Sequence, residues 1–232
     1  MEKSKKVVEW VGGSILRGVE TENSDADIYC VVIPPIDYYF GLNKKLEHLQ
    51  SEIKLTNKDE IKYLEIKKYF NLLLKNDFSS VESLFVPKEL YIGSDKYEII
   101  IANRHLFLDK DKLYNMAIVM SNSHIAYFIS TNMTGRTHDK FKPLRYKKAY
   151  IALSVLFEIA DLLSTGTLTL PIPDVGFLRN VRAGRHSDRE IMDMFEVGRK
   201  RLENAYKDSV IDKQSIGGAS DLSVALLIDI FF

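Results

Sequence analysis

The sequence has little of several features that mark special classes of protein. Its 232 residues include a single cysteine, Cys30, so an intramolecular disulfide is excluded. The 32 basic and 32 acidic side chains give a formal net charge of zero, which argues against a protein whose whole surface binds a polyanion. The longest apolar stretch, residues 222–232, is interrupted by Asp229 and is far shorter than a membrane span. No internal repeat and no low-complexity segment is evident.

What is present is the composition of an ordinary globular protein. Hydrophobic residues make up 46% of the chain and charged residues 28%, and the length suits one large domain or two small ones. The charged start, residues 1–6, and the short apolar run after it do not form a signal peptide. We therefore expect a soluble, cytoplasmic protein with no membrane partner and with Cys30 buried in a strand. The sequence leaves its oligomeric state open.

A glycine turn follows the first apolar run of the chain. Val7, Val8, Trp10 and Val11 indicate a strand, and the segment 12–14, Gly-Gly-Ser, comes where that strand must turn sharply. Backbone N–H groups exposed at such a turn, together with a serine hydroxyl, can hold phosphate oxygens. The alternative is that the segment is only a flexible turn.

Two carboxylates precede the second apolar run. Asp25 and Asp27 lie just before and at the mouth of the run 28–33, which indicates a strand. Because side chains alternate along a strand, residues two apart project from the same face, and two like charges there repel unless a cation lies between them. A divalent ion that prefers oxygen ligands, such as Mg²⁺, suits this pair. A phosphate site beside such a pair is what phosphoryl or nucleotidyl transfer requires.

The chain resembles the DNA polymerase β-like nucleotidyltransferase superfamily in the order and spacing of three segments: Gly13-Ser14, Arg17-Gly18 and Ser24-Asp25-Ala26-Asp27. The segment 34–42 is similar to the bacterial and phage branch associated with RNA ligases. The resemblance implies an α+β fold in which a nucleotidyltransferase domain with a mixed sheet, residues 1–108, is followed by a helical domain, residues 109–232.

The resemblance also implies an activity. Asp25, Asp27 and a third carboxylate would bind two Mg²⁺ (or Mn²⁺) ions, and Gly13, Ser14 and Arg17 would hold the triphosphate of ATP or another nucleoside triphosphate. The enzyme would transfer a nucleoside monophosphate to an acceptor hydroxyl and release pyrophosphate. The acceptor, whether RNA, a protein or a small molecule, is left open. The alternative is a nucleotide- or RNA-binding module of the same fold with weak or no catalysis.

The third carboxylate has two candidates. Residues 59–66 indicate a strand that runs directly into a helix over 66–76, and the superfamily supplies its third carboxylate from a strand at this place in the order. Glu65 is the first choice for a catalytic metal ligand. Glu60 competes with it, because on one strand the two side chains project from opposite faces. Glu65 could instead cap the start of the helix, where acids are favoured.

A local basic segment is the clearest charge asymmetry in the chain. Lys147 and Lys148 of this segment are predicted to contact the triphosphate. Alternatively, the segment could bind a nucleic-acid backbone or form a solvated helix start. The whole segment comprises Arg136, His138, Lys140, Lys142, Arg145, Lys147 and Lys148.

The rest of the chain is predicted to be largely helical. Apolar residues are dense over 113–131, and they recur at helical spacing over 146–163. Ser187 and Glu190 fit a capping box that opens a helix ending near residue 206. Residues 97–102 are predicted to form a last strand of the sheet.

Overall fold

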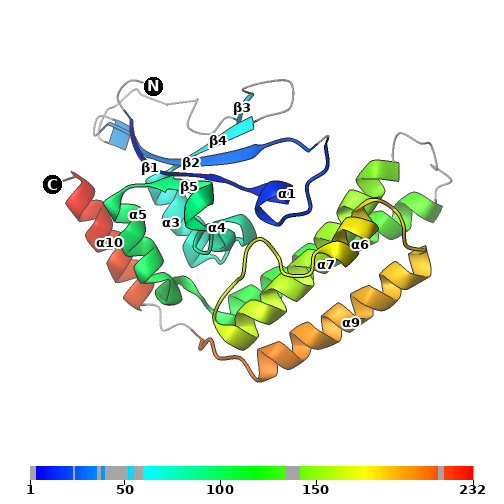
Figure 1. The fold of residues 1–232 in the computed structure, drawn as a ribbon. Coiled ribbons are helices and arrows are strands. Elements are labelled where there is room, and N and C mark those ends of the chain that lie inside the picture. Colours follow the sequence, from blue (N-terminus) through cyan, green and yellow to red (C-terminus); the bar gives the residue numbers. More distant parts are fainter. Residues whose placement is uncertain are drawn as a thin grey trace. The chain divides into compact units, whose positions relative to one another are not determined.

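The computed structural model of the chain contains two compact units (Figure 1). The first unit is Met1–Leu108 together with Gln214–Phe232, and the second is Asp109–Lys213. The division into domains 1–108 and 109–232 stays a prediction of the sequence. The structure describes residues 4–22, 24–35, 38–39, 52–54, 60–133, 142–213 and 217–231.

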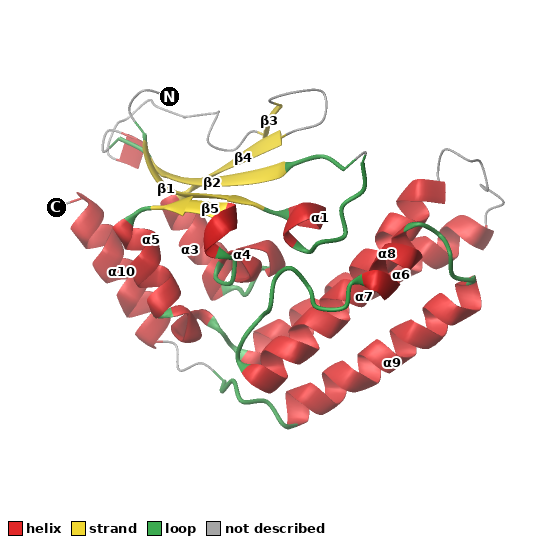
Figure 2. Ribbon diagram, in the orientation of Figure 1, coloured by secondary structure: helices red, strands yellow, loops and turns green. Residues whose placement is uncertain are grey.

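A five-stranded mixed sheet forms the centre of the first unit (Figure 2). Its strand order is β3-β4-β2-β1-β5; β2 and β4 run parallel, and the other neighbouring pairs are antiparallel. This sheet with its helices confirms the predicted α+β class. The strands are β1 (Lys5–Val11), β2 (Asp27–Ile33), β3 (Glu52–Lys54), β4 (Glu60–Glu65) and β5 (Tyr91–Gly93).

Alternation along the central strands gives the sheet two faces. Trp10 of β1 stacks on Tyr29 of β2 with ring centroids 5.0 Å apart, and Tyr69 of helix α3 (Ile66–Leu74) packs on the same tryptophan. Cys30 and Val32 lie buried on the other face, as the period of two requires. The prediction of a buried cysteine within the second strand is therefore confirmed.

Short helices complete the first unit. Residues 97–102, predicted as a strand, belong to helix α5 (Asp95–Ala102), in which Tyr97 and Ile100 are buried three residues apart. That prediction was wrong, because an apolar run of this length fits a helix as well as a strand. The other helices are α1 (Gly13–Leu16), α4 (Phe78–Ser83), α10 (Gly217–Phe231) and the 3₁₀ turns Lys88–Leu90 and Arg104–Phe107.

The second unit is helical throughout its described elements. Helix α7 (Lys142–Thr165) is the most buried of them, because its neighbours α6 (Lys110–Met133), α8 (Gly176–Arg182) and α9 (Asp188–Lys207) pack against it. The predicted capping box at Ser187 and Glu190 is confirmed at the start of α9. Among the helices that the structure describes, none is long and apolar enough to cross a membrane.

Candidate functional site

Two backbone hydrogen bonds bring three distant segments together at one end of β2. The N–H of Gly12 donates to the carbonyl oxygen of Asp27 at 2.8 Å, which ties the glycine turn to the strand. The N–H of Glu60 donates to the carbonyl oxygen of Ala26 at 3.1 Å. In the parallel pairing of β2 with β4, Asp27 then lies opposite Glu60. The glycine turn, the aspartate pair and Glu60 therefore meet at the same end of the sheet.

Gly13 is held against the carboxylate of Asp27. Its φ of +64° lies in the left-handed region, where a side chain is strained. A Cβ atom at this position would lie 2.3 Å from Oδ2 of Asp27, which is far inside van der Waals contact. Only glycine lets the turn approach this carboxylate so closely. The structure thus brings two of the predicted site residues together.

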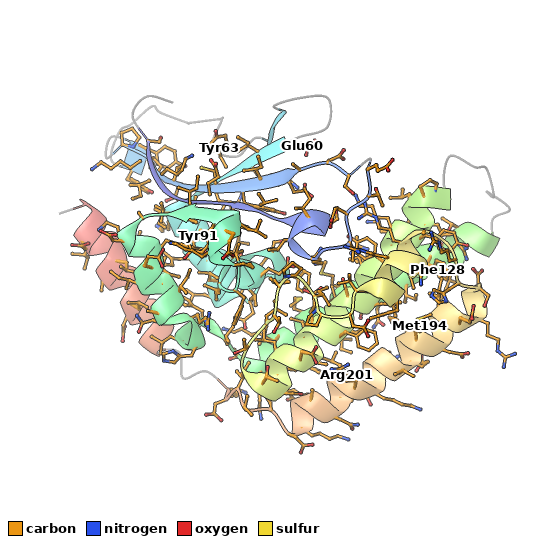
Figure 3. The ribbon with its side chains drawn as sticks, viewed as in Figure 1. Glu60, Tyr63, Tyr91, Phe128, Met194 and Arg201 are labelled. Atoms are coloured by element: carbon orange, nitrogen blue, oxygen red, sulfur yellow. The ribbon has the colours of Figure 1, made fainter. Side chains whose placement is uncertain are left out.

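An ammonium group identifies the face on which the carboxylates lie. Nζ of Lys62 is 3.2 Å from Oδ1 of Asp27, so the two side chains share a face of the sheet. Glu60, labelled on β4 in Figure 3, precedes Lys62 by two residues, and alternation along the strand places both side chains on the same face. Asp27 keeps 34% of its side-chain surface exposed, so its carboxylate is open to a ligand. Lys62 was not among the residues predicted for the site, although its position two residues after Glu60 on a predicted strand places it on the same face.

Glu65 lies at the other end of the same pair of strands. Its register partner is Val32, five residues along β2 from Asp27, a span of about 16 Å at the rise of a strand. Glu65 also projects from the face opposite to that of Glu60. Its carboxylate caps helix α3, accepting hydrogen bonds from the N–H of Lys67 at 2.7 Å and of Lys68 at 2.9 Å. The structure does not bring Glu65 to Asp27.

The remaining carboxylate, Asp25, is exposed two residues before β2. The oxygen donors at this end of the sheet, from Asp25, Asp27 and Glu60, are of the type that Mg²⁺ prefers. Within the part of the chain that the structure describes, no three His, Cys, Asp or Glu side chains are grouped closely enough to hold a metal ion. The oxygen donors are thus of the right chemical type for Mg²⁺. They are not gathered around one point among the described residues, and Asp27 is paired with Lys62.

Arg17 is turned into the interior of the first unit. Its Nη2 lies 2.7 Å from Oε2 of Glu82, and the two side chains are only 8% and 4% exposed. The guanidinium also lies over the ring of Phe78, 4.9 Å from the ring centroid. Burial raises the pKa of Glu82, and the arginine opposes that shift. Ser14, in the first turn of α1, is nearly buried as well.

Residues 6–214 match the family described as the RNA repair pathway DNA polymerase beta family. The chain belongs to this family. The match covers most of the chain and confirms the resemblance that the glycine turn and the aspartate pair indicate. Membership of this family supports a nucleotidyltransferase-like role for the chain. A search of the curated proteins gave no match.

The basic segment of this polymerase beta family member lies partly outside the described residues. Arg136, His138 and Lys140 fall outside them, as does the side chain of Lys142. Arg145 serves the packing of the second unit, because its Nη2 lies 2.6 Å from Oδ2 of Asp188 and its Nε donates to a backbone carbonyl.

Lys147 and Lys148 follow on α7 of the second unit. Lys147 is exposed, and Lys148 is half-buried. Burial lowers the pKa of His124, and the positive charge of Lys148 lowers it further. A contact of either lysine with a nucleotide stays a prediction.

Proposed function

We propose that the protein is a Mg²⁺-dependent nucleotidyltransferase that moves a nucleoside monophosphate from a nucleoside triphosphate to an acceptor hydroxyl. The acceptor oxygen forms a bond to the α-phosphorus, the bond from that phosphorus to the bridging oxygen breaks, and pyrophosphate leaves. Family membership supports the class of reaction. The observation that carries the proposal is the meeting of Gly13, Asp27 and Glu60 at one end of the sheet.

Asp25, Asp27 and Glu60 are the proposed ligands of the divalent ions, Mg²⁺ or Mn²⁺. Glu60 takes the role first expected of Glu65, because it shares both the strand end and the sheet face of Asp27. Divalent ions held here would neutralise the triphosphate and the charge that develops on the leaving group. Glu65 has a structural role in this proposal, since its carboxylate caps helix α3.

Lys62 sets a condition on metal binding. Its ammonium lies against Oδ1 of Asp27, where a metal ligand would need the oxygen free. A divalent ion that uses Oδ1 therefore competes with the lysine, and once displaced Lys62 can neutralise the phosphate groups of the bound nucleotide. In the absence of the ion, the ammonium relieves the repulsion between the neighbouring carboxylates.

The remaining predicted contacts go to the substrate and the acceptor. Gly13 and Ser14 are proposed to hold triphosphate oxygens, and Lys147 and Lys148 to contact the triphosphate. Arg17 supports the turn from inside the unit through its pair with Glu82. The family description refers to an RNA repair pathway, and we therefore favour RNA as the acceptor. The cytoplasmic location expected from the sequence stays a proposal.

Labelled nucleotides test the proposal. The protein is incubated with Mg²⁺ and each nucleoside triphosphate, labelled at the α- or the γ-phosphate, with total RNA present. We expect label transfer from the α-phosphate only, lost with a chelator and in Asp27→Asn, and kept in the control Asp95→Asn, which changes an exposed acid of α5. Transfer of the γ-label would contradict the proposed reaction.

A second candidate is the nucleotide- or RNA-binding module without turnover. The observation that favours it is the contact of Lys62 with Asp27, because an ammonium group at this carboxylate competes with a metal ion. Nucleotide binding without transfer of either label would identify this case.

A further inference from the structure

Three aromatic rings form a stack on the face of the sheet that carries Asp27. Trp10 of β1 and Tyr29 of β2 are register partners, and their rings are stacked with centroids 5.0 Å apart and planes 10° apart. Tyr69 of α3 packs on the same tryptophan, with centroids 6.2 Å apart. Trp10 and Tyr69 are 2% and 0% exposed. The ring of Tyr29 is therefore supported by fully buried side chains, which fix its position because protein interiors are close-packed.

The ring of Tyr29 also lies against Gly12, the first residue of the glycine turn. A Cβ atom at Gly12 would lie 2.6 Å from Cε2 and 2.9 Å from Cδ2 of Tyr29, closer than a methyl group can pack. The backbone of Gly12 is extended, with φ −114° and ψ −159°, which residues other than glycine adopt as well. The obstacle to a side chain at Gly12 is therefore the tyrosine ring and not the backbone conformation.

Two contacts with β2 hold the glycine turn in place. The N–H of Gly12 donates to the carbonyl oxygen of Asp27 at 2.8 Å, and the ring of Tyr29 packs against the same glycine. Because Asp27 and Tyr29 are two residues apart on one strand, their side chains project from the same face. The tyrosine ring therefore limits how closely the turn can approach the face on which the carboxylate of Asp27 lies.

Tyr29 contacts the charged neighbour of Asp27 as well. Lys62 is the register partner of Tyr29 on β4, and its Nζ lies 5.4 Å from the centroid of the tyrosine ring and 3.2 Å from Oδ1 of Asp27. A cation over an aromatic face is attracted by the electrons of the ring. A single ring thus contacts both the glycine turn and the lysine that lie against Asp27.

We propose that Tyr29 is a positioning residue, whose ring fixes the glycine turn and Lys62 relative to the carboxylate of Asp27. It acts through these groups and does not itself contact the nucleotide or the metal ions. In the proposed nucleotidyl transfer, on which this inference rests, the turn holds the triphosphate. A shift of the turn therefore moves the reacting phosphate relative to the carboxylates, and a displacement of about 1 Å can reduce the rate about 100-fold.

Substitutions of the tyrosine test the role of its ring. Tyr29→Val removes the ring and keeps a β-branched side chain that suits a strand, whereas Tyr29→Phe keeps the ring. At saturating nucleotide we expect α-label transfer to be about 100-fold slower in Tyr29→Val and close to wild type in Tyr29→Phe, with a smaller change in KM. The matched control is Tyr63→Val on β4, because Tyr63 projects from the opposite face and packs against Cys30 and Val32. A folded Tyr29→Val protein with wild-type transfer would overturn the proposal.

A double-mutant cycle tests the contact between Gly12 and Tyr29. Gly12→Ala alone places a methyl group against the ring and should lower both the urea midpoint of unfolding and the transfer rate. In the Tyr29→Val protein the atoms Cδ2 and Cε2 are absent, so the added methyl group should cause little further loss. We therefore expect the two substitutions to be strongly non-additive, as for residues in direct contact. Additive effects would contradict the proposed coupling.

The urea measurements do not require the reaction, and this separates the inference from the proposed function. If the wild type transfers no label, the proposed function fails, and the affinity for ATP with Mg²⁺, measured by calorimetry, decides the role of Tyr29. Weaker ATP binding in Tyr29→Val and Gly12→Ala than in Tyr63→Val would support the positioning role, and equal binding in all of them would refute it. Non-additive unfolding with wild-type transfer and ATP affinity would make Tyr29 a packing residue only and would also refute it. A wild type that neither transfers label nor binds ATP would overturn both proposals.

Discussion

The contact between Gly13 and Asp27 leads to the sharpest prediction for the proposed active site. Gly13→Ala adds one carbon atom, and that atom would lie 2.3 Å from Oδ2 of Asp27. The substitution also places a side chain at a φ of +64°. Because the turn is tied to β2 by the Gly12–Asp27 hydrogen bond, it cannot withdraw without breaking that bond.

The structure gives two magnitudes for this change. The left-handed conformation costs about 1–2 kcal/mol for a residue with a Cβ atom, and this lowers the free energy of unfolding. An ordinary contact begins at 3.4 Å, so the carboxylate of Asp27 must move by about 1 Å (3.4 − 2.3 = 1.1). A displacement of about 1 Å at a reacting centre can reduce the rate about 100-fold.

Two measurements on the same protein separate these effects. Urea denaturation gives the free energy of unfolding, and label transfer from an α-labelled nucleoside triphosphate gives the rate. The matched control is Gly176→Ala at the start of α8, where an added Cβ meets no atom within 4 Å. We expect the control to equal the wild type in transfer and to be at least as stable. A Gly13→Ala protein with wild-type transfer would refute the reasoning.

Three further predictions concern burial and charge. Burial raises the pKa of Cys30 from 9.0 to about 11. Alkylation of this thiol, followed by mass spectrometry, should therefore be about 100-fold slower in the folded protein than in the urea-unfolded protein. The part of the free energy of unfolding that depends on this thiol should be present below pH 9.0 and lost as the pH rises to about 11. Glu82→Ala leaves the buried charge of Arg17 without its carboxylate and should lower the free energy of unfolding by about 3–5 kcal/mol in urea denaturation. The double substitution Lys147→Ala and Lys148→Ala should weaken nucleotide binding in a titration; if RNA is the ligand instead, it should flatten the salt dependence of RNA affinity by about one to two units of log–log slope.

Local features of the site could be predicted from the sequence. The apolar runs before Gly12 and after Asp27 predict the first two strands, and the glycines predict the turn between the first strand and the helix. Both are readable because strand period and turn chemistry depend on neighbouring residues. The capping box at Ser187 was predictable for the same reason.

Long-range pairing could not be read from the sequence. Alternation shows that Glu60 and Glu65 point to opposite faces, but only the register of β4 against β2 shows which of them reaches Asp27. The ion pair of Arg17 with Glu82 joins residues 65 positions apart, and no local pattern signals it. For this reason Arg17 was predicted from the sequence to contact the triphosphate, whereas in the structure its side chain is buried with Glu82.

The assignment of the metal ligands depends most on Glu60, because the register alone selects it over Glu65. The decisive measurement compares the rate of α-label transfer in Glu60→Gln and in Glu65→Gln, each first shown to be folded by circular dichroism. Both substitutions remove one carboxylate from β4 and keep the size of the side chain. We predict that Glu60→Gln loses transfer, whereas Glu65→Gln keeps it with a small loss of stability from the weaker helix cap. Transfer lost in Glu65→Gln and kept in Glu60→Gln would contradict the proposed site.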